Sequence, residues 1–234
     1  MKTIAIINAS GKGVRCGGDI HKQFRLLNDK PVLYYSLNMF EKNNSIDEIY
    51  VVCEKEYFDF VEQLCKDNNI NKFVYSIEGG TTANMSRYYG LNGIKNANED
   101  DIIIMHDAVR ITTKDSTITE LVNKTQKEGQ CVCGTTLNAN IFRTSNDKVF
   151  YDDDIPSKNV FVCSMPFGCR YETLKTAFDD AMEEGDVDSY AGPMGVVGMY
   201  GESDFFSKIE LDYTETIKIT YDRDFEIIDK LIND

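Results

Sequence analysis

Residues 4–24 read IAIINASGKGVRCGGDIHKQF, and this stretch decides the fold that the sequence predicts. The apolar run at residues 4–7 has the length and composition of a buried parallel strand. It ends in a loop that holds four glycines together with the cationic side chains Lys12, Arg15, His21 and Lys22. Glycines allow tight turns and bring backbone N–H groups close to an anion. We interpret the stretch as a strand that opens into a phosphate-binding loop, with an ordinary strand-to-helix turn as the alternative.

The glycine spacing excludes two familiar nucleotide-binding patterns. The pattern GxxxxGK[ST] is absent, and GxGxxG fails because Cys16 stands where its third glycine would be. The loop is therefore predicted to bind phosphate in another way than these two motifs do.

Beyond the loop, apolar runs typical of strands alternate with amphipathic patterns typical of helices. We expect strands at residues 49–53, 72–77, 101–105 and 130–135, and helices at 31–42, 58–65, 84–95 and 118–127. This alternation indicates parallel βαβ units. The predicted fold class is α/β, a Rossmann-like doubly wound, mostly parallel twisted sheet with helices on both faces.

The rhythm changes at about residue 137. Residues 137–159 are polar and include an acidic run and Pro156, so we expect a protruding β-arm and not a second domain. The chain is then predicted to be a single domain over residues 1–234. After the arm we expect a strand at 160–163, a helix at 171–182, short strands near 196–200, 208–212 and 216–220, and a closing helix at 225–232.

Composition limits the partners of the protein. The net charge of −14 argues against a nucleic-acid or acidic-membrane partner, because its long-range field repels polyanions. No apolar run has the length of a membrane span, and the N-terminus does not read as a signal peptide. We therefore expect a cytoplasmic protein whose anion site is local.

The seven cysteines form no disulfide pattern, and their number is odd. Several lie in apolar, strand-like runs, namely Cys53, Cys131, Cys133 and Cys163. Buried free thiols of a cytoplasmic protein explain them. A zinc site is not expected, because the chain holds only two histidines and no CxxC pair.

Ligands of doubly wound sheets bind beyond the carboxyl ends of the strands. Asp107 ends the most apolar strand, and beside a triphosphate a carboxylate there would hold Mg²⁺. Arg110 could meet a phosphate with its planar fork. Lys218 alternates with isoleucines and would face the same crevice. The alternatives are a turn-capping Asp107 and an edge-strand lysine, while His106 is more simply a packing residue.

Together and in this order, the motifs resemble those of the CTP-dependent cytidylyltransferases that act on methylerythritol phosphate and ribitol 5-phosphate. The family patterns LAGGxGxRM…PKQF, GGxxRxxS, HD[AS][AV]RP and NIKIT/NLKIT are similar to residues 8–24, 79–86, 106–111 and 216–220. Residues 154–158, DIPSK, resemble the DIPNR of the ribitol-phosphate branch, and Val109 also favours that branch.

The resemblance implies a role for each matched residue. Arg15, Lys22 and Lys218 would be catalytic, binding phosphates and stabilising the transition state. The nucleotide would lie against Ala9, Ser10, Gly11, Gly13, Gly80, Thr81 and Ser86. The acceptor would be held by Arg110, Asn140, Lys158 and Lys218, and Mg²⁺ by Asp107. The arm at 137–159 would be exchanged within a homodimer.

Several positions depart from the family patterns, mostly where the acceptor is recognised: Ser10, Ala83, Ile111, Ala139 and Phe167. Ser10 replaces a glycine and Ala83 replaces an arginine. The sequence therefore predicts CMP transfer from CTP to a phosphorylated alditol such as ribitol 5-phosphate. The alternatives are the same chemistry on 2-C-methyl-D-erythritol 4-phosphate or another phosphorylated acceptor, and a catalytically silent nucleotide-binding relative.

Overall fold

The structure is a computed structural model that describes residues 1–13, 16–17, 20–146, 148–151, 159–203 and 205–233. Two predicted site residues, Arg15 and Lys158, lie outside the described residues.

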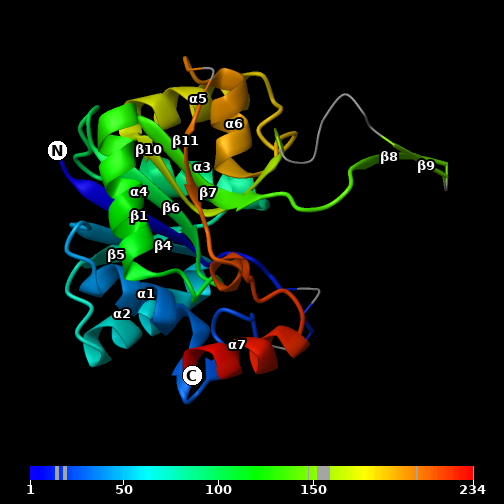
Figure 1. Ribbon diagram of the computed structural model, residues 1–234. Helices are drawn as coiled ribbons and strands as arrows, with labels where there is room; N and C mark the ends of the chain where they lie inside the picture. Colours follow the sequence, from blue (N-terminus) through cyan, green and yellow to red (C-terminus); the bar gives the residue numbers. More distant parts are fainter. Residues whose placement is uncertain (14–15, 18–19, 147, 152–158, 204, 234) are drawn as a thin grey trace.

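A seven-stranded sheet forms the centre of the molecule (Figure 1). Its strands, in spatial order, are β11 (Ser207–Glu210), β7 (Gln130–Thr136), β10 (Phe161–Arg170), β6 (Ile102–Asp107), β1 (Thr3–Asn8), β4 (Glu48–Cys53) and β5 (Phe73–Glu78). Strand β10 runs antiparallel to both β6 and β7, while the other neighbouring pairs are parallel. The mostly parallel sheet confirms the predicted α/β class.

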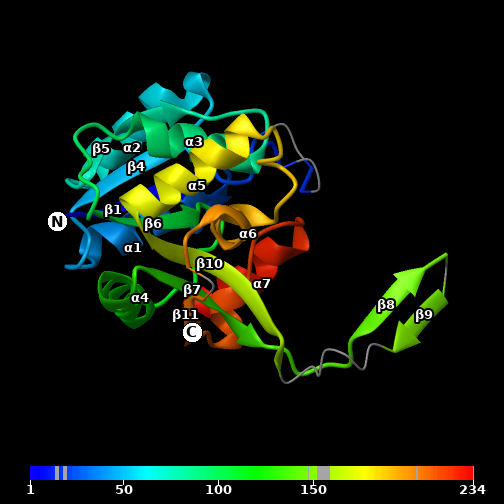
Figure 2. The same ribbon diagram turned by 90° about the horizontal axis from the view of Figure 1, so that it is seen from above.

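Helices cover both faces of the sheet (Figure 2). One face carries α1 (Val32–Lys42), α2 (Phe58–Asp67) and α4 (Asp115–Glu128), and the other carries α3 (Ala83–Gly93), α5 (Tyr171–Glu183) and α6 (Gly192–Tyr200). Strand β1 serves both layers because successive side chains of a strand point to opposite faces. Ala5 and Ile7 pack with the first set of helices, whereas Ile4 and Ile6 pack with the second.

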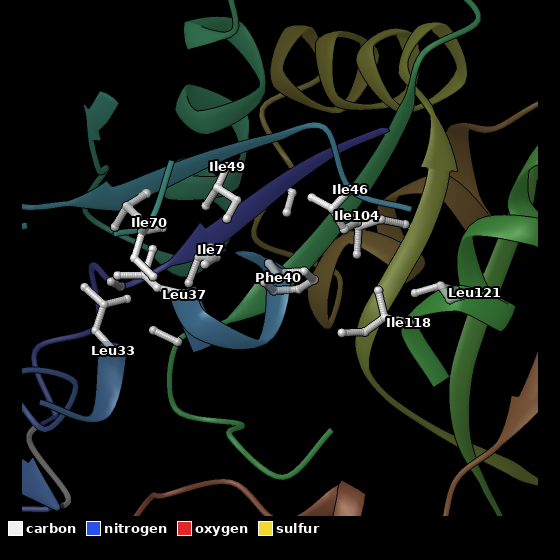
Figure 3. Packing of buried hydrophobic residues seen from close by; sticks show 14 of the residues in the cluster. Ile7, Leu33, Leu37, Phe40, Ile46, Ile49, Ile70, Ile104, Ile118 and Leu121 are labelled. Carbon is white, nitrogen blue, oxygen red and sulfur yellow. The ribbon is translucent and has the colours of Figure 1, made fainter. Parts of the chain in front are cut away.

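Helix α1 shows how the apolar pattern builds one of these layers. Leu33, Leu37 and Phe40 recur at helical spacing, are fully buried, and point with Ile7 into the core between α1 and the sheet (Figure 3). Pro31 is the N-cap residue and not the first helical residue, so α1 begins one residue later than predicted. The stripe therefore fixes how α1 lies beneath the carboxyl end of β1.

Two predicted strands are wrong. Residues 192–200 form helix α6, although the segment is rich in glycine and valine, because Val196 and Val197 are buried against the layer that contains α5. Residues 217–220 follow a short 3₁₀ helix, η3 (Tyr213–Thr216), and pair with no strand of the sheet. Ile219 is still buried, and its N–H donates to the Val109 carbonyl at 3.1 Å.

Helix α7 (Arg223–Asn233) closes the chain, as predicted. Its Ile228 packs with Ile219 and Val109 in a small third core that also contains Val32 of α1. This core holds the 217–220 segment against the end of β6. Short elements complete the body: β2 (Leu26–Leu27), β3 (Lys30–Pro31) and the 3₁₀ turn η1 (Lys55–Tyr57).

The expected arm is a hairpin of β8 (Phe142–Ser145) and β9 (Lys148–Tyr151) that projects away from the body (Figures 1 and 2). Its large apolar side chains Phe142 and Phe150 are 49% and 52% exposed.

All seven cysteines are described, and all are free. Cys163 is exposed, however, so the prediction that it is buried is wrong. It lies near the end of β10 that leads to the arm, where helices no longer cover the strand (Figure 2). Within the described residues, no helix has the length and apolar character needed to cross a membrane.

Candidate active site

The candidate site lies where β1 and β6 end side by side, because Asn8 and Asp107 are register partners in neighbouring parallel strands. A cavity of about 100 Å³ opens there. Its described lining consists of Asn8, Ala9, Gly11, Lys22, Gln23, Ala83, Arg87, Asp107, Val109 and Lys218. Five chain segments therefore meet at the edge of the sheet where doubly wound folds bind their ligands.

Asp107 is the centre of this site. The residue is 7% exposed, and its carboxylate is surrounded by cationic side chains. Lys218 Nζ donates to Oδ2 at 2.7 Å, and Arg87 Nη2 donates to Oδ1 at 3.1 Å. Arg110 Nε lies 3.8 Å from Oδ2, and Arg110 Nη1 donates to the Thr216 carbonyl at 2.6 Å. The negative charge of Asp107 thus has three positively charged neighbours.

These contacts keep Asp107 ionised. Burial by itself would raise the pKa of Asp107, but the charges of Lys218 and Arg87 outweigh burial and lower that pKa well below its usual range. The neighbouring His106 is fully buried, and burial lowers its pKa to about 4 despite the nearby Asp107 charge. His106 is therefore neutral near pH 7, and its Nε2 lies 2.8 Å from the Arg110 carbonyl. This supports the packing interpretation of His106.

The glycine loop after β1 is held in place by Gln23. This side chain is 1% exposed, and its Nε2 donates to the carbonyls of Ala9 and Gly11 at 2.5 and 3.0 Å. Gly13 adopts a positive φ of 65°, which favours glycine, and lies against the Lys22 side chain. Lys22 Nζ donates to the Ile219 carbonyl at 2.7 Å, which places the lysine beside the Lys218 segment.

Ser10 joins the glycine loop to the loop before α3. Its Oγ donates to Ser86 Oγ at 2.7 Å, and Ser86 Oγ in turn accepts from the Gly80 N–H at 3.0 Å. A Cβ atom at Gly79 would lie only 2.6 Å from the Ser10 Cβ, so the two loops touch. The serine that departs from the family pattern therefore has a structural place.

The structure brings together most of the predicted site residues that it describes. Five line the cavity: Ala9, Gly11, Lys22, Asp107 and Lys218. Others adjoin it through the contacts above: Ser10, Gly13, Gly80, Ser86 and Arg110. Thr81 is exposed on the loop before α3. Asn140 is exposed near the base of the arm and is not part of the described lining.

Five residues of the described lining had no predicted site role, namely Asn8, Gln23, Ala83, Arg87 and Val109, and two of these make polar contacts that build the site. Gln23 stood within a quoted motif but had no assigned role, and its signal was only that motif. Arg87 lies one helical turn after Ala83, the position where the family pattern has an arginine. An arginine four residues later on the same helix was a signal that could have been read.

A larger hollow of about 580 Å³ lies elsewhere, between α2 and the edge strand β5. Its described charged residues are Glu62 and Lys66, which pair with each other at 2.8 Å. It lies away from the carboxyl ends of β1 and β6, and it brings together no cluster of cations. Size therefore does not identify the site here, whereas charge and topology do.

A divalent cation can be tested against this donor set. The described residues contain no group of three His, Cys, Asp or Glu side chains that could hold a metal. Mg²⁺ commonly needs only one or two carboxylates when phosphate oxygens supply further ligands. Asp107 meets this need if Lys218, whose side chain is 36% exposed, leaves Oδ2. The site thus fits Mg²⁺ that arrives with phosphates.

The sheet and the cavity define the chain as an α/β protein with a cluster of cationic side chains at the strand ends. The chain belongs to the 2-C-methyl-D-erythritol 4-phosphate cytidylyltransferase family, whose model matches residues 3–233. The members of this family are nucleotidyltransferases, and the chain is one of them.

Relatives of two names are similar to the chain. A 2-C-methyl-D-erythritol 4-phosphate cytidylyltransferase of Lachnoclostridium phytofermentans is 32% identical over 194 residues, which are 82% of this chain and 78% of the relative. A ribitol-5-phosphate cytidylyltransferase of Lacticaseibacillus paracasei is 31% identical over 190 residues, 79% of this chain and 80% of the relative. Sequence identity alone does not separate the two names.

Solved structures share the fold. A 4-diphosphocytidyl-2C-methyl-D-erythritol synthase of Anaerococcus prevotii has a TM-score of 0.82 at 16% identity, covering 100% of this chain and 96% of that chain. A 2-C-methyl-D-erythritol 4-phosphate cytidylyltransferase of Francisella tularensis has a TM-score of 0.79 at 24% identity, covering 98% and 99%. These likenesses confirm the architecture of the sheet and its helices.

Proposed function

We propose that the protein transfers CMP from CTP to a phosphorylated alditol and releases pyrophosphate. The observation that carries the proposal is the cluster at Asp107, where Lys218, Arg87 and Arg110 surround one carboxylate beside Lys22. Such a surplus of positive charge suits a reaction between two phosphorylated molecules.

The reaction needs charge and positioning more than it needs a base. A phosphate oxygen of the acceptor attacks the α-phosphorus of CTP, forming a P–O bond while the bond to the pyrophosphate oxygen breaks. The attacking oxygen is already anionic, so no proton has to be removed, and the neutral, buried His106 is not needed as a base. The barrier is repulsion between polyanions, which preorganised cations and N–H groups offset.

The cations Lys22, Lys218 and Arg110 have the clearest tasks. We assign Lys22, beside the glycine loop, to the CTP phosphates, and we assign Lys218 and Arg110 to the acceptor phosphate. Lys218 is the most exposed partner of Asp107 and can turn from that carboxylate to a phosphate oxygen. The resemblance gives Arg15 and Lys158 similar tasks, and both residues lie outside the described part of the chain.

We propose Asp107 as the residue that would hold Mg²⁺. When bound, the ion would neutralise phosphate charge. Pockets that hold small-molecule ligands measure about 300–1,000 Å³, whereas this cavity measures about 100 Å³. The rest of the nucleotide would therefore lie outside the cavity. Ala9, Ser10, Gly80 and Ser86, joined by the hydrogen bonds between the two loops, are placed to line its base.

We favour ribitol 5-phosphate as the acceptor. The support is the DIPSK segment and Val109, which lines the cavity, together with a relative that carries the ribitol-phosphate name. The second candidate is 2-C-methyl-D-erythritol 4-phosphate, which the family model and another relative support.

Pyrophosphate release tests the proposal. The purified protein is incubated with CTP, a divalent cation and, in turn, ribitol 5-phosphate, 2-C-methyl-D-erythritol 4-phosphate and other alditol phosphates. We expect release with ribitol 5-phosphate at the highest kcat/KM, and little release when ATP, GTP or UTP replaces CTP. Tight CTP binding without release for any acceptor would support the silent relative instead.

We further propose that the protein is a cytoplasmic homodimer. The hairpin of β8 and β9 supports the dimer, because it projects from the body with Phe142 and Phe150 exposed, and apolar surface of this kind favours a protein partner. The free cysteines support a reducing compartment. The net charge of −14 supports the absence of nucleic-acid and membrane partners.

A further inference from the structure

Arg87 is a buried cation on the second turn of α3. Its side chain is only 9% exposed, yet it belongs to the lining of the cavity at the strand ends. Nη1 donates to Asn84 Oδ1 at 2.9 Å, and Nη2 donates to Asp107 Oδ1 at 3.1 Å. Burying a charge is costly unless a partner compensates it, so the balance of charge around Arg87 is informative.

That balance is positive. Arg87, Arg110 and Lys218 contact Asp107, which gives three positive charges against one and a surplus of two. Lys22 lines the same cavity and adds to the surplus. Such an arrangement is most stable when an anion joins it, and a phosphate group carries the charge that is required.

Arg87 is more deeply buried than Lys218, with side chains 9% and 36% exposed. Its neighbour Asn84 is itself buried, and Asn84 Nδ2 donates to the carbonyls of Val187 and Tyr190 at 2.7 and 2.9 Å. The guanidinium is thus anchored through Asn84 to the segment between α5 and α6. When Lys218 turns to a substrate phosphate, Arg87 keeps Asp107 paired and oriented.

The residue one turn earlier leaves Arg87 open to the cavity. Positions 83 and 87 lie on the same face of α3, because residues four apart on a helix are neighbours. Ala83 is exposed, lines the cavity and ends at Cβ, so it does not cover the guanidinium. The segment GGTTANMSR therefore carries its arginine about 6 Å further along the helix axis than GGxxRxxS would.

We propose that Arg87 is a substrate-binding residue peculiar to this arrangement: a fixed guanidinium that binds a phosphate oxygen of CTP while it holds Asp107. The inference rests on the proposed function, because the phosphate is that of the nucleotide substrate. It assigns to α3 a cation that the family motif does not place at this position.

Variants at position 87 separate charge from size. Arg87→Gln removes the charge but keeps a hydrogen-bonding side chain, Arg87→Lys keeps the charge, and Arg87→Ala removes both. Arg170→Ala is the matched control, since Arg170 pairs with the exposed Asp100 at 3.4 Å and lies beside Ile102, at the opposite end of β6 from Asp107. Binding of CTP and of pyrophosphate is measured by calorimetry at one fixed concentration of divalent cation, and kcat and KM are measured separately.

We expect Arg87→Gln and Arg87→Ala to weaken binding of both ligands by about 10-fold or more and to lower kcat by about 10²-fold, the cost typical of losing a preorganised donor. Arg87→Lys should retain more of both, and Arg170→Ala should match the wild type. In an Arg87→Ala background, adding Ala83→Arg should restore part of the pyrophosphate affinity, because it returns a guanidinium to the same helix face.

An Arg87→Gln protein with wild-type affinity and kcat would overturn the inference, even if its melting temperature fell, since Arg87 would then be only a structural ion pair. If Arg87→Ala does not fold, Arg87→Gln decides the question alone. Failure of the proposed function has a different signature: the wild type would release no pyrophosphate from CTP, while pyrophosphate binding would still report on Arg87.

Discussion

Asp107 organises the site because it is the only acidic residue among the described residues that line the cavity. Each of its oxygens has a cationic partner, and the partners come from α3, from the turn after β6 and from the 217–220 segment. A single carboxylate thus contacts three cations from separate parts of the chain.

Removing either lysine of the site, Lys22 or Lys218, tests this arrangement. We expect Lys22→Ala and Lys218→Ala each to lower kcat by about 10² or more, because each removes a preorganised cation. Neither should unfold the protein, since Asp107 keeps Arg87 and Arg110 as partners in both variants. Lys66→Ala, at an exposed ion pair on α2, is the control and should keep full turnover. Near-normal kcat in either site variant would contradict the assigned roles.

His106 gives the stability a defined pH dependence. Burial lowers its pKa to about 4 from an ordinary value of 6.5, so below pH 6.5 the unfolded chain takes up a proton that the folded chain refuses until about pH 4. The free energy of unfolding should therefore fall by up to about 1.4 kcal/mol per pH unit as the pH is lowered through this window. Urea unfolding of wild type and His106→Gln at pH 5 and pH 7 measures it. Equal pH dependence in both proteins would show that His106 is not the group responsible.

At the scale of elements, α3 carries Arg87 and must lie close to the sheet. Gly90 permits this approach, because a Cβ atom there would lie 2.6 Å from Val52 Cγ2 and 3.1 Å from Ile6 Cγ2. The absence of a side chain at one position thus sets how near the arginine stands to Asp107.

A matched pair of glycine substitutions tests the close packing of α3. Gly90→Ala gains about 1 kcal/mol of helix propensity but overpacks the interface at a cost of about 1–3 kcal/mol, so we expect a lower midpoint of thermal unfolding. Gly198→Ala on α6 gains the same propensity and meets Phe206 only at ordinary contact distances of 3.7 Å and more. Its midpoint should rise. If the midpoints of both variants rise, propensity and not packing dominates at Gly90.

The 217–220 segment shows why the predicted strand did not form. Its alternating isoleucines predict a strand, and the alternation survives, since Ile219 is buried and Lys218 reaches Asp107. What replaces sheet pairing is one backbone hydrogen bond to Val109, together with side-chain contacts and the small core under α7. Alternation of apolar and polar residues indicates which side of a segment is buried. Here that side is buried against helix α7 and the loop after β6, not in a sheet.

At the scale of the whole molecule, the hairpin of β8 and β9 projects from the body and is not packed against the sheet or its helices. In the proposed homodimer, Phe142 and Phe150 would be buried against a second copy of the chain. Burying a large apolar side chain contributes about 1.5–3 kcal/mol. Exposing both side chains to water in the monomer therefore gives the dimer a substantial driving force.

The oligomeric state tests the role of the arm. We expect light scattering to give the mass of a dimer for the wild type and of a monomer for the Phe142→Ser/Phe150→Ser double variant at micromolar concentration. The midpoint of thermal unfolding of the body should be the same in the double variant as in the wild type, because these side chains pack in none of the three cores. A wild-type monomer would contradict the dimer proposal, and a double variant that stays dimeric would place the interface elsewhere.

The sequence by itself determined the α/β class, the helices and strands of the first half, and half of the cavity residues that the structure describes. Apolar periodicity reports burial directly, and the glycine loop, Asp107 and Lys218 lie within ordered motifs that a reader can match. The resemblance to cytidylyltransferases, now supported by the family match over residues 3–233, rested on those same motifs.

Only the tertiary structure decided the rest. Helix α6 formed where a strand was predicted, because burial against neighbouring elements outweighed local propensity. Arg87 entered the site because α3 carries it to Asp107, twenty positions away in sequence and 3.1 Å away in space. Ser10 found its place against Ser86 for the same reason. Spacing along the chain fixes which side chains share a face, whereas the charges that meet across a cleft depend on how separate elements pack.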